Sequence, residues 1–554
     1  MNKNCSIYAV RAVQIHEALI EVWYLSIINK LNNPNFWLGV AILSFITGQF
    51  QLQAEVKLPD MFSHGMVLQQ QTPVNLWGEA APGEKVVVEL SGDKAVAVAD
   101  THGKWRVKLP SRSAGGPYTM TVSGNNQLTI RDLWVGEVWL CSGQSNMRWN
   151  LKSTLTAEAC AKVIAEANFP QLRQFWIEKN VARAPQEQLQ GRSSWTVCQP
   201  NTAAGFSATA YFFGRELHRR LNVPVGVIVS AQGGTPSEAW TSLNALDSDP
   251  AYVDIYRDWQ KRLANFPAAM KRYNEVDLPK WEAAVQQAQT MGKPKPQKPI
   301  PPTGYDHQAY PANLFNAMIA PLIPYTLRGI AWYQGESNAD SMAEALQYYT
   351  LFPTLIRDWR ARWAAGDIPF LFVQLANFRA LQTVPVEDSS WPVLREAQSQ
   401  TLALSNTGMA VAIDINNEPE NIHPRNKEEI GRRLALVALE KVYKQKIVSS
   451  GPRYSSMIIE GPSIRVRFSH SEGGLKARSN EKPSKLTGFA IAGADGKFVW
   501  AHAVIEGDSV VLSNSEVASP TAVRYSWADN PIGNLYNDAG LPASPFRSDI
   551  PLLK

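Results

Sequence analysis

Cysteine is scarce in this sequence, with four among 554 residues. Cys5 stands near the N-terminus, Cys141 lies inside an apolar run, and Cys160 and Cys198 stand apart. So few cysteines exclude a fold that depends on a dense disulfide framework. Cys160 and Cys198 either pair after export or stay as free buried thiols, and the sequence leaves both options open.

The chain also has little excess charge of either sign. It contains 54 Lys and Arg and 49 Asp and Glu, which gives a net charge of +5. The basic residues are scattered, so nucleic acid is not an expected partner. The eight histidines are isolated, and neither C-x-x-C nor H-E-x-x-H occurs, so we predict no metal site. There is no phosphate-cradling glycine loop either, so no cofactor is expected; the oligomeric state stays open.

Long hydrophobic runs are missing except near the N-terminus, where residues 36–48 read FWLGVAILSFITG. This run is short for a membrane span, and LQAE follows it, with Leu52 and Ala54 in the cleavage positions. We therefore predict that residues 1–54 are a signal peptide or other targeting segment and that the mature chain begins near Glu55. The protein would then be periplasmic or extracellular, with no stable membrane insertion after processing. An N-terminal anchor helix is the alternative.

Apolar residues make up 45% of the chain, and its length suggests about two to four domains with sizeable cores. Residues 55–133 carry short alternating runs, such as KVVVEL and WRVKL, separated by turn residues. This pattern predicts an N-terminal β domain that resembles a sandwich. Residues 446–554 return to the same rhythm and predict a C-terminal β-rich region.

Between these regions, apolar strands alternate with amphipathic helices, the pattern of an α/β fold with a doubly wound parallel sheet. We assign this domain to residues 134–244 and 306–445. The expected strands are 134–141, 223–230, 328–334, 369–375 and 408–414. The expected helices are 156–167, 206–221, 341–363, 391–404 and 426–444. Residues 245–305, polar and helical with a proline-rich stretch at 292–302, predict an insertion that acts as lid, rim or spacer.

Small polar residues follow four of the predicted strands. They are Gly-Gln-Ser-Asn at 143–146, Gly-Gly-Thr-Pro at 233–236, Gly-Glu-Ser-Asn at 335–338 and Ile-His-Pro at 422–424. Ligands of parallel sheets bind outside the carboxyl ends of the strands, so we expect these four segments to converge.

Together these segments supply what acyl transfer requires. Ser145 is the candidate nucleophile and His423 the base that takes its proton, while Ser142 belongs to the turn. The Ser145 N–H, a glycine N–H at Gly233 and the Asn338 amide can stabilise the oxyanion, each donor contributing about 10²–10³ in rate. The common G-x-S-x-G elbow does not occur, because Met stands at position 147.

These blocks resemble those of the SGNH hydrolases. WLCSGQSNM, GGTPSEAW, WYQGESNA, IHPRNK and GLPASPFRSD more closely resemble the sialate O-acetylesterase family, and the likeness runs from about residue 57 almost to the C-terminus. The resemblance implies an SGNH hydrolase domain with Ser145 as nucleophile and His423 as base. It implies the Ser145 and Gly233 N–H groups and Asn338 as oxyanion donors, with Gly234 as the near alternative to Gly233.

The third catalytic member is where the sequence departs from the broader SGNH pattern. Many relatives place Asp three residues before the histidine, and Glu420 stands there. Glu420 is one candidate to orient the imidazole, and Asp414 at a strand end is a second. A Ser–His dyad steered by a backbone carbonyl is the third.

The predicted function is an exported serine esterase that works through an acetyl-serine intermediate. The resemblance points to O-acetylated sialic acid, in particular the 9-O-acetyl form, as substrate; its carboxylate would need a basic partner, for which several arginines qualify. Gln144, Gln334 and Glu336 are candidates to orient the substrate. Another acetylated glycan such as acetylxylan is the alternative substrate. A non-catalytic glycan-binding protein and a glycosidase using Glu336 are the rival classes.

Overall fold

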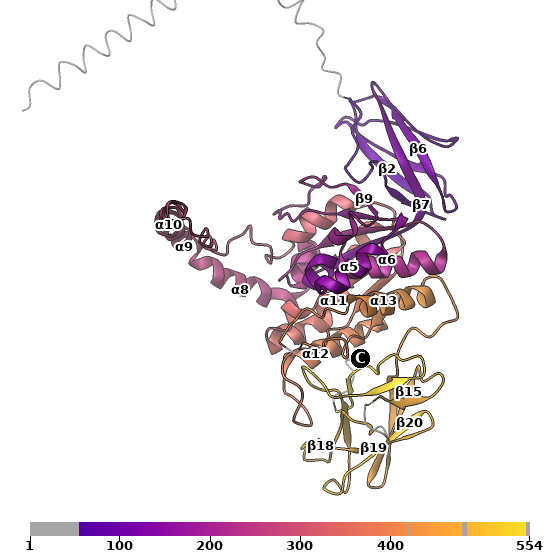
Figure 1. The fold of residues 1–554 in the computed structure, drawn as a ribbon, viewed down its shortest axis with the longest axis vertical. Coiled ribbons are helices and arrows are strands. Elements are labelled where there is room, and N and C mark those ends of the chain that lie inside the picture. The colour runs from indigo at the N-terminus through magenta and orange to yellow at the C-terminus, as the bar shows by residue number, and fades with distance from the viewer. Residues whose placement is uncertain (1–54, 419, 479–484, 550–554) are drawn as a thin grey trace, which may run out of the picture. The chain divides into compact units, whose positions relative to one another are not determined.

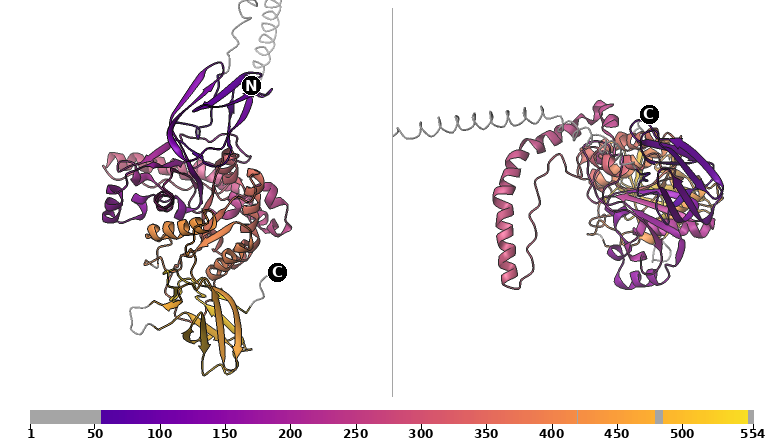
Figure 2. Two further views of the ribbon diagram at one scale, coloured as in Figure 1. Left: turned by 90° about the vertical axis from the view of Figure 1, so that its right-hand side faces the viewer. Right: turned by 90° about the horizontal axis from the view of Figure 1, so that it is seen from above.

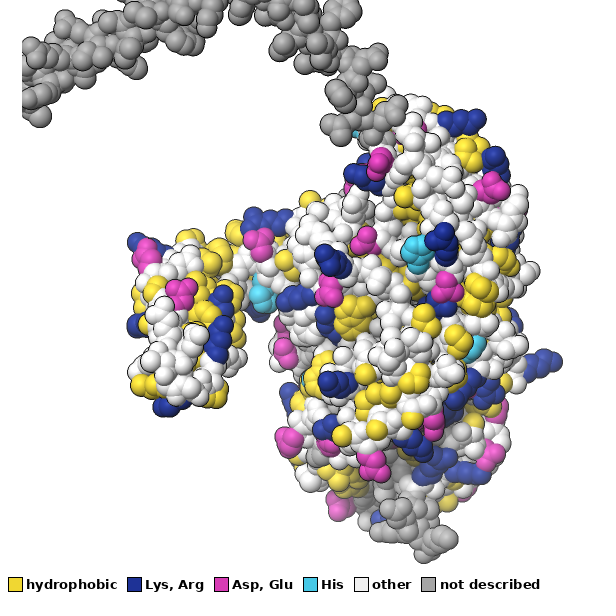
Figure 3. Space-filling view, turned by 45° about the horizontal axis from the view of Figure 1, so that its top comes forward, with side chains coloured by type: hydrophobic (Ala, Val, Ile, Leu, Met, Phe, Trp, Pro, Cys, Tyr) yellow, Lys and Arg dark blue, Asp and Glu magenta, His cyan; other side chains and the backbone are white. Residues whose placement is uncertain are grey.

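The computed structural model describes residues 55–549, except residue 419 and residues 479–484. The predicted targeting segment 1–54, with Cys5, lies outside these residues. In the part described, no helix is long and apolar enough to cross a membrane. On the face that Figure 3 draws, basic and acidic side chains are mixed rather than separated into patches.

Antiparallel pairs make up most of the N-terminal region, as its alternating pattern predicts, while β1 pairs in parallel with β7. β2 pairs with β5, and β3 pairs with β4 and β6. β6 pairs in turn with β7 (Gln127–Gly143). The bounds of the other strands are β1 (Val67–Gln69), β2 (Val74–Glu79), β3 (Lys85–Leu90), β4 (Asp93–Val98), β5 (Lys104–Leu109) and β6 (Gly115–Ser123).

The long strand β7 continues from this region into a mixed α/β part with a largely parallel central sheet. The strand order there is β13-β12-β11-β7-β10-β8-β9, and only the last pair is antiparallel. The predicted boundary at residue 134 therefore falls inside one strand. The strands are β8 (Phe169–Trp176), β9 (Trp195–Cys198), β10 (Val225–Ala231), β11 (Gly329–Tyr333), β12 (Phe370–Val373) and β13 (Thr407–Ala410).

Two of these strands, β8 and β9, have no counterpart in the sequence prediction. β8 reads FPQLRQFW, so it carries no apolar run. Its Arg173 and Gln174 are nevertheless buried, because Arg173 pairs with Asp132 at 2.7 Å and Gln174 accepts from the Ser207 backbone N–H at 2.8 Å. Tertiary partners thus allow a polar segment to occupy an interior strand.

Helices cover both faces of the central sheet (Figure 1). Along β7, Val138 and Leu140 pack into one core, while Trp139 and Cys141 pack into the other. The first core contains residues of α11 (Met342–Trp363) and α12 (Ser390–Gln400), and the second contains residues of α6 (Ala208–Leu221) and α13 (Lys427–Lys441). This arrangement is what alternating strands and helices predict.

A close helix contact sets the position of α13. A Cβ at Gly431 would lie 2.5 Å from Cβ of Phe212 in α6, so only glycine allows the two helices to approach this closely. α13 begins four residues after His423, and its position therefore determines where the histidine loop lies.

Residues 243–290 form helices, and the last of them lie away from the central sheet, as Figure 2 shows. Trp259 packs with Tyr252 and Leu351 in a small separate core at the base of α8. Neither α9 nor α10 buries a residue. The bounds are α7 (Leu243–Asp247), α8 (Val253–Ala264), α9 (Phe266–Arg272), the π-helical η5 (Tyr273–Asp277) and α10 (Leu278–Thr290).

The C-terminal region is built of antiparallel strands in the orders β14-β15-β20-β19, β18-β17-β21-β23 and β16-β22. They surround a core of their own that includes Val466, Phe489 and Val523. The bounds are β14 (Arg453–Glu460), β15 (Ser463–Ser469), β16 (Leu475–Ala477), β17 (Phe489–Ala492), β18 (Val499–Trp500), β19 (His502–Glu506), β20 (Ser509–Ser513), β21 (Ala522–Tyr525), β22 (Leu535–Asn537) and β23 (Phe546–Arg547).

The cysteines that the structure describes are all free and buried: Cys141, Cys160 and Cys198. Cys160 and Cys198 therefore do not pair, and the expectation of free buried thiols is confirmed. Both lie in the core beneath α6, and burial raises the pKa of the Cys198 thiol to about 12.

One buried cation joins the C-terminal region to the central sheet. Arg395 in α12 is completely buried and donates to the carbonyls of Leu375, Ala376, Ala528 and Asp529 at 2.7–2.8 Å. Burial lowers the pKa of its guanidinium to about 9. These four bonds connect the segment after β12 with the segment after β21.

We expect Arg395→Met to lower the free energy of unfolding by about 3–5 kcal/mol, because it leaves several buried carbonyls without donors. Urea unfolding of the purified protein measures this loss. Arg467→Met, which changes an exposed arginine of β15, is the matched control and should stay within about 0.5 kcal/mol of the native chain. If the two substitutions lowered the free energy of unfolding equally, Arg395 would not have the joining role described above.

Candidate active site

Three strands end side by side at the edge where the predicted segments converge. β10 and β11 flank β7, so that Gly143 lies between Ala231 and Tyr333. The strand order reverses around β7, and such a switch point is where open parallel sheets bind ligands. A Cβ at Gly143 would lie 2.2 Å from the Tyr333 carbonyl oxygen, so glycine is required for the chain to turn there.

Ser145 is the first residue of the short helix α3 (Ser145–Arg148), two residues beyond the end of β7. Ser145 is 7% exposed. Ser142, which the sequence assigns to the turn, instead belongs to β7 and is fully buried. The prediction for Ser142 is therefore wrong, because the strand continues one residue beyond it.

His423 approaches Ser145 from the loop before α13. Its Nε2 lies 2.9 Å from Oγ of Ser145, a hydrogen-bond distance. The indole of Trp149 stacks on the imidazole, with ring centroids 3.9 Å apart and planes at 19°. Burial, with a smaller contribution from the charge of Lys427, lowers the pKa of His423 to about 4. The imidazole is thus neutral at pH 7 and able to accept the serine proton.

Neither candidate carboxylate contacts the histidine. Glu420 is exposed. Asp414 accepts from Arg433 at 2.6 and 2.9 Å and from Tyr536 at 3.0 Å, so its oxygens are occupied elsewhere. Across residues 55–549 apart from the gaps, nothing hydrogen-bonds to Nδ1 of His423. Trp149 stacks on the imidazole ring. The backbone N–H of His423 donates to the Asn421 side chain at 2.9 Å, and these two contacts hold the histidine in place.

Two backbone N–H groups, those of Ser145 and Gly233, lie close to the serine hydroxyl's position on α3. A Cβ at Gly233 would be 3.3 Å from Cβ of Ser145, so the two residues are in contact. No described residue accepts a hydrogen bond from the N–H of either one, and both remain available to an oxyanion. Gly234 is exposed, with a φ of +67° that favours glycine at this turn.

Asn338 is buried behind this loop, and its amide has defined partners. Its Oδ1 accepts from the Ser237 N–H at 2.8 Å and from Gln334 at 2.7 Å. Its Nδ2 donates to Glu238 at 3.0 Å, which leaves one amide hydrogen for a ligand. Burial raises the pKa of Glu238 to about 7.

The three residues predicted to orient the substrate are buried and bind protein atoms. Gln144 accepts from the backbone N–H groups of Gly335 and Ser337 at 3.4 and 3.3 Å. Gln334 donates to Asn338 and accepts from Tyr348 at 2.9 Å. Glu336, 4% exposed, accepts from the Asn146 side chain. Their side chains hold the strand ends in register with one another.

Several residues around the site escaped the sequence analysis, although three of them stand inside the blocks it singled out. Trp149 follows the first block, while Asn146, Glu238 and Lys427 lie within three of them. Arg148 is half-buried, donates to the Ala231 carbonyl at 2.8 Å and lies 4.9 Å from the Trp176 ring centroid. Nothing in their spacing distinguishes them from ordinary neighbours; what marks them is partial or complete burial.

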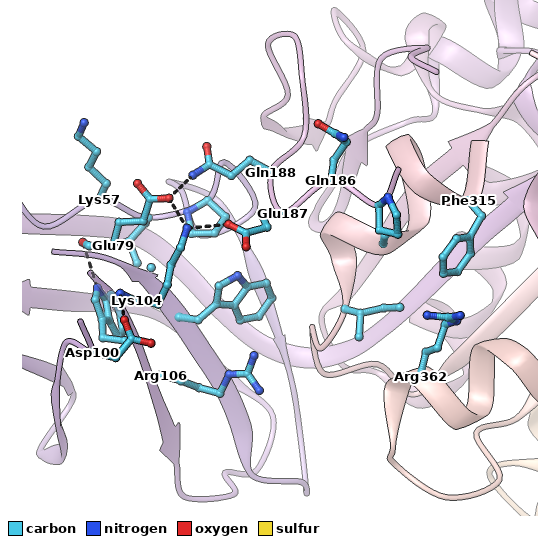
Figure 4. A pocket seen from close by; sticks show the side chains of 18 residues that line it. Lys57, Glu79, Asp100, Lys104, Arg106, Gln186, Glu187, Gln188, Phe315 and Arg362 are labelled. Atoms are coloured by element: carbon cyan, nitrogen blue, oxygen red, sulfur yellow. Dashed lines mark hydrogen bonds and ion pairs between the residues drawn. The ribbon is translucent and has the colours of Figure 1, made fainter. Parts of the chain in front are cut away.

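A separate cavity of about 930 Å³ lies between the N-terminal strands and residues 185–188, 315–323 and 362 (Figure 4). Lys104 in its wall pairs with Glu79 and Glu187, each at 2.7 Å. Neither Ser145 nor His423 lines it, so it is not the site described above. Within the described residues, no group of three or more His, Cys, Asp or Glu is placed to hold a metal ion.

The chain is similar to known carbohydrate esterases. Residues 305–440 match the family described as carbohydrate esterase, sialic acid-specific acetylesterase. The chain is 27% identical over 533 residues to sialate O-acetylesterase of Mus musculus, a match that covers 88% of this chain and 93% of that protein. To the Homo sapiens enzyme it is 27% identical over 560 residues, covering 93% and 96%.

Among solved structures, the chain is similar to a carbohydrate acetylesterase from Xanthomonas citri. The two are 37% identical, with a TM-score of 0.73, and the match covers 89% of this chain and 99% of that one.

Because the Trp149 indole covers His423, we expect its removal to change the pH dependence of the activity. In Trp149→Ala, water reaches His423, and its pKa should rise from about 4 toward the ordinary 6.5. Because only neutral imidazole takes the serine proton, activity is lost as pH falls through this pKa. The acid limb of kcat/KM on p-nitrophenyl acetate should therefore move upward. Trp500→Ala, in β18, is the control; equal limbs in the two variants would refute the effect.

Proposed function

We propose that this chain, which belongs to the sialate O-acetylesterase family of carbohydrate esterases, removes O-acetyl groups from sialic acids through an acetyl-serine intermediate. It is a carboxylic ester hydrolase, as its relatives are. The observation that carries the proposal is the 2.9 Å contact between Oγ of Ser145 and Nε2 of His423 at the switch point of the sheet.

In the first half of the reaction, Nε2 of His423 takes the hydroxyl proton as Oγ of Ser145 attacks the acetyl carbonyl. The N–H groups of Ser145 and Gly233 and the remaining amide hydrogen of Asn338 donate to the oxyanion. The carbon–oxygen bond to the sugar then breaks, and the sugar alcohol leaves with the proton from His423. In the second half, water gives a proton to Nε2 of His423 and attacks the acetyl carbon. The bond between that carbon and Oγ of Ser145 then breaks, Oγ takes the proton back from His423, and acetate leaves.

We assign a Ser–His dyad rather than a triad with a carboxylate. Glu420 is exposed and Asp414 is paired with Arg433, so neither is positioned to accept from Nδ1. Stacking against Trp149 holds the ring plane, the task that the third residue performs in triads. Gly234 and the buried Gln144, Gln334 and Glu336 shape the loops that carry the donors.

Arg148 is our candidate for the partner of the sialic acid carboxylate. It lies three residues after Ser145 on the same short helix, and residues at this spacing share a helix face. Its guanidinium makes no ion pair with a described carboxylate, and its one protein hydrogen bond goes to a carbonyl. Four N–H donors thus remain for an acid group, which arginine binds in bidentate fashion.

The flanking regions complete the assignment. We interpret residues 55–133 and 446–554 as sandwich-like β domains, since both are built mainly of paired antiparallel strands. We interpret residues 245–305 as an insertion in the catalytic domain of 134–244 and 306–445. The N-terminal apolar run with its cleavage pattern supports export to the periplasm or the extracellular space.

Acetate release from 9-O-acetyl sialic acid, beside acetylated xylan, tests the function. We expect Ser145→Ala to lower kcat/KM by at least about 10³-fold, because the nucleophile is lost. Preference for xylan would overturn the substrate and leave the mechanism intact. Equal rates for native protein and Ser145→Ala would favour a glycan-binding protein. Release of free sugar, abolished in Glu336→Gln, would indicate a glycosidase.

Arg148→Gln tests the carboxylate partner. Loss of a charged hydrogen bond of about 1.5–3 kcal/mol should lower kcat/KM on O-acetyl sialic acid by about 10–100-fold more than on a neutral acetylated sugar. Arg183→Gln, which removes an exposed arginine paired with Asp306, is the control. Equal losses on the acidic and neutral substrates would assign Arg148 a structural role only.

A further inference from the structure

A lysine is completely buried beside the serine and histidine. Lys427 is the first residue of α13, and its side chain has no exposed surface. Its ammonium donates to Oδ1 of Asn146, the residue after Ser145, and lies 5.4 Å from the ring centroid of Tyr333. Burial lowers the pKa of Lys427 to about 7, against the opposing charge of Glu336.

Asn146 connects this lysine to two other parts of the site. Its Nδ2 donates to the carboxylate of Glu336, after β11, and to the carbonyl of Ile422 at 3.2 Å. Ile422 directly precedes His423, and Asn146 directly follows Ser145. One amide therefore ties the backbone beside the nucleophile to the backbone beside the base.

Such an arrangement is costly to maintain. A buried charge must be paired, and a buried ion pair typically contributes no more stability than apolar residues of the same shape. Glu336 is 4% exposed, and burial raises the pKa of its carboxyl. Its second oxygen, like the hydroxyl of Tyr333, has no protein hydrogen-bond partner. Stability alone therefore does not account for the group.

We propose that Lys427, Asn146 and Glu336 form a buried positioning unit that holds Ser145 and His423 at reacting distance, and that the charge of Lys427 adds to burial in keeping the imidazole unprotonated. The inference rests on the proposed function, because it concerns the same serine and histidine. None of the three touches the reacting atoms; they act through the two residues that do.

The sign of the charge effect follows from the groups around His423. Lys427 on α13 is the charge that acts on it, and the ammonium and Glu336 both bind the side chain of Asn146. On its own loop, Glu418 and Arg425 neutralise each other at the exposed surface. A positive charge near an imidazole disfavours the protonated form, so Lys427 lowers the pKa of His423. Removing that charge should make the histidine easier to protonate.

The experiment is the pH profile of kcat/KM on p-nitrophenyl acetate for Lys427→Met. We expect the acid limb to move upward by about one pH unit, because neutral His423 is the active form. kcat at the optimum should fall at least about tenfold, since the tie between the two loops is weakened. A loss of packing alone would lower the rate equally at every pH.

The double variant Lys427→Met/Glu336→Gln is measured in the same way. It leaves no unpaired buried charge, so it replaces Lys427→Met in the test if the single variant does not fold. We expect its acid limb to lie above the native one and its melting temperature above that of Lys427→Met. Lys152→Met, which removes an exposed charge from α4 (Leu151–Thr154), is the matched control and should leave the limb in place. An unmoved limb in both Lys427 variants overturns the charge role.

Asn146→Ala tests positioning while both charges remain. kcat should fall about 10²-fold with KM within about threefold of native, as expected for misplaced reacting groups. Native kcat in this variant overturns the positioning role, and so decides the matter if neither Lys427 variant folds. Ser145→Ala separates the two proposals: if it is fully active, the proposed function fails, whereas its inactivity beside native profiles for Lys427→Met and Asn146→Ala refutes the inference alone.

Discussion

The register of β7 between β10 and β11 is the constraint on which the site depends. It places Gly143 opposite Ala231 on one side and Tyr333 on the other. A shift of one residue would turn Ser142 toward the wrong core and carry Ser145 away from Gly233. Because neighbouring strands come from residues far apart in the chain, Ser145 and Gly233 meet only once the sheet has formed.

Buried polar groups then set the finer geometry. Gln144 and Gln334 hold the loops after β7 and β11 with hydrogen bonds to backbone and side-chain atoms. Lys427 and Asn146 hold the loop that carries His423. In a low-dielectric interior each of these groups must find a partner, so few alternative loop conformations remain available. A site built in this way is rigid before its substrate arrives.

Much of this could be predicted from the sequence, for definable reasons. The strands with continuous apolar runs were found because both of their faces are buried. β8 was missed, since Arg173 and Gln174 are satisfied by partners elsewhere in the chain. The sequence predicts that Ser145 and His423 act together, because chemistry restricts the residue types that can serve, and the structure brings the two side chains within 2.9 Å.

The features that the sequence alone does not reveal have a common cause. Gln334 and Glu336 suggest substrate contacts in sequence, yet they face inward. A lysine at the start of a helix suggests a solvated side chain, and the burial of Lys427 depends on Asn146, 281 residues away. Glu420 fits the expected spacing but points into solvent. Spacing identifies which residues share a loop, whereas orientation depends on what packs against that loop.

The seventeen residues of β7 have a mechanical consequence. Its first half pairs with β6 in the antiparallel region, and its second half is an interior strand of the parallel sheet. No flexible linker separates the two, so tension or local melting in the N-terminal strands is transmitted along one backbone to the residues before Ser145. Pairing with the N-terminal strands thus stiffens the strand that leads to Ser145. The N-terminal region and the parallel sheet therefore gain or lose order together.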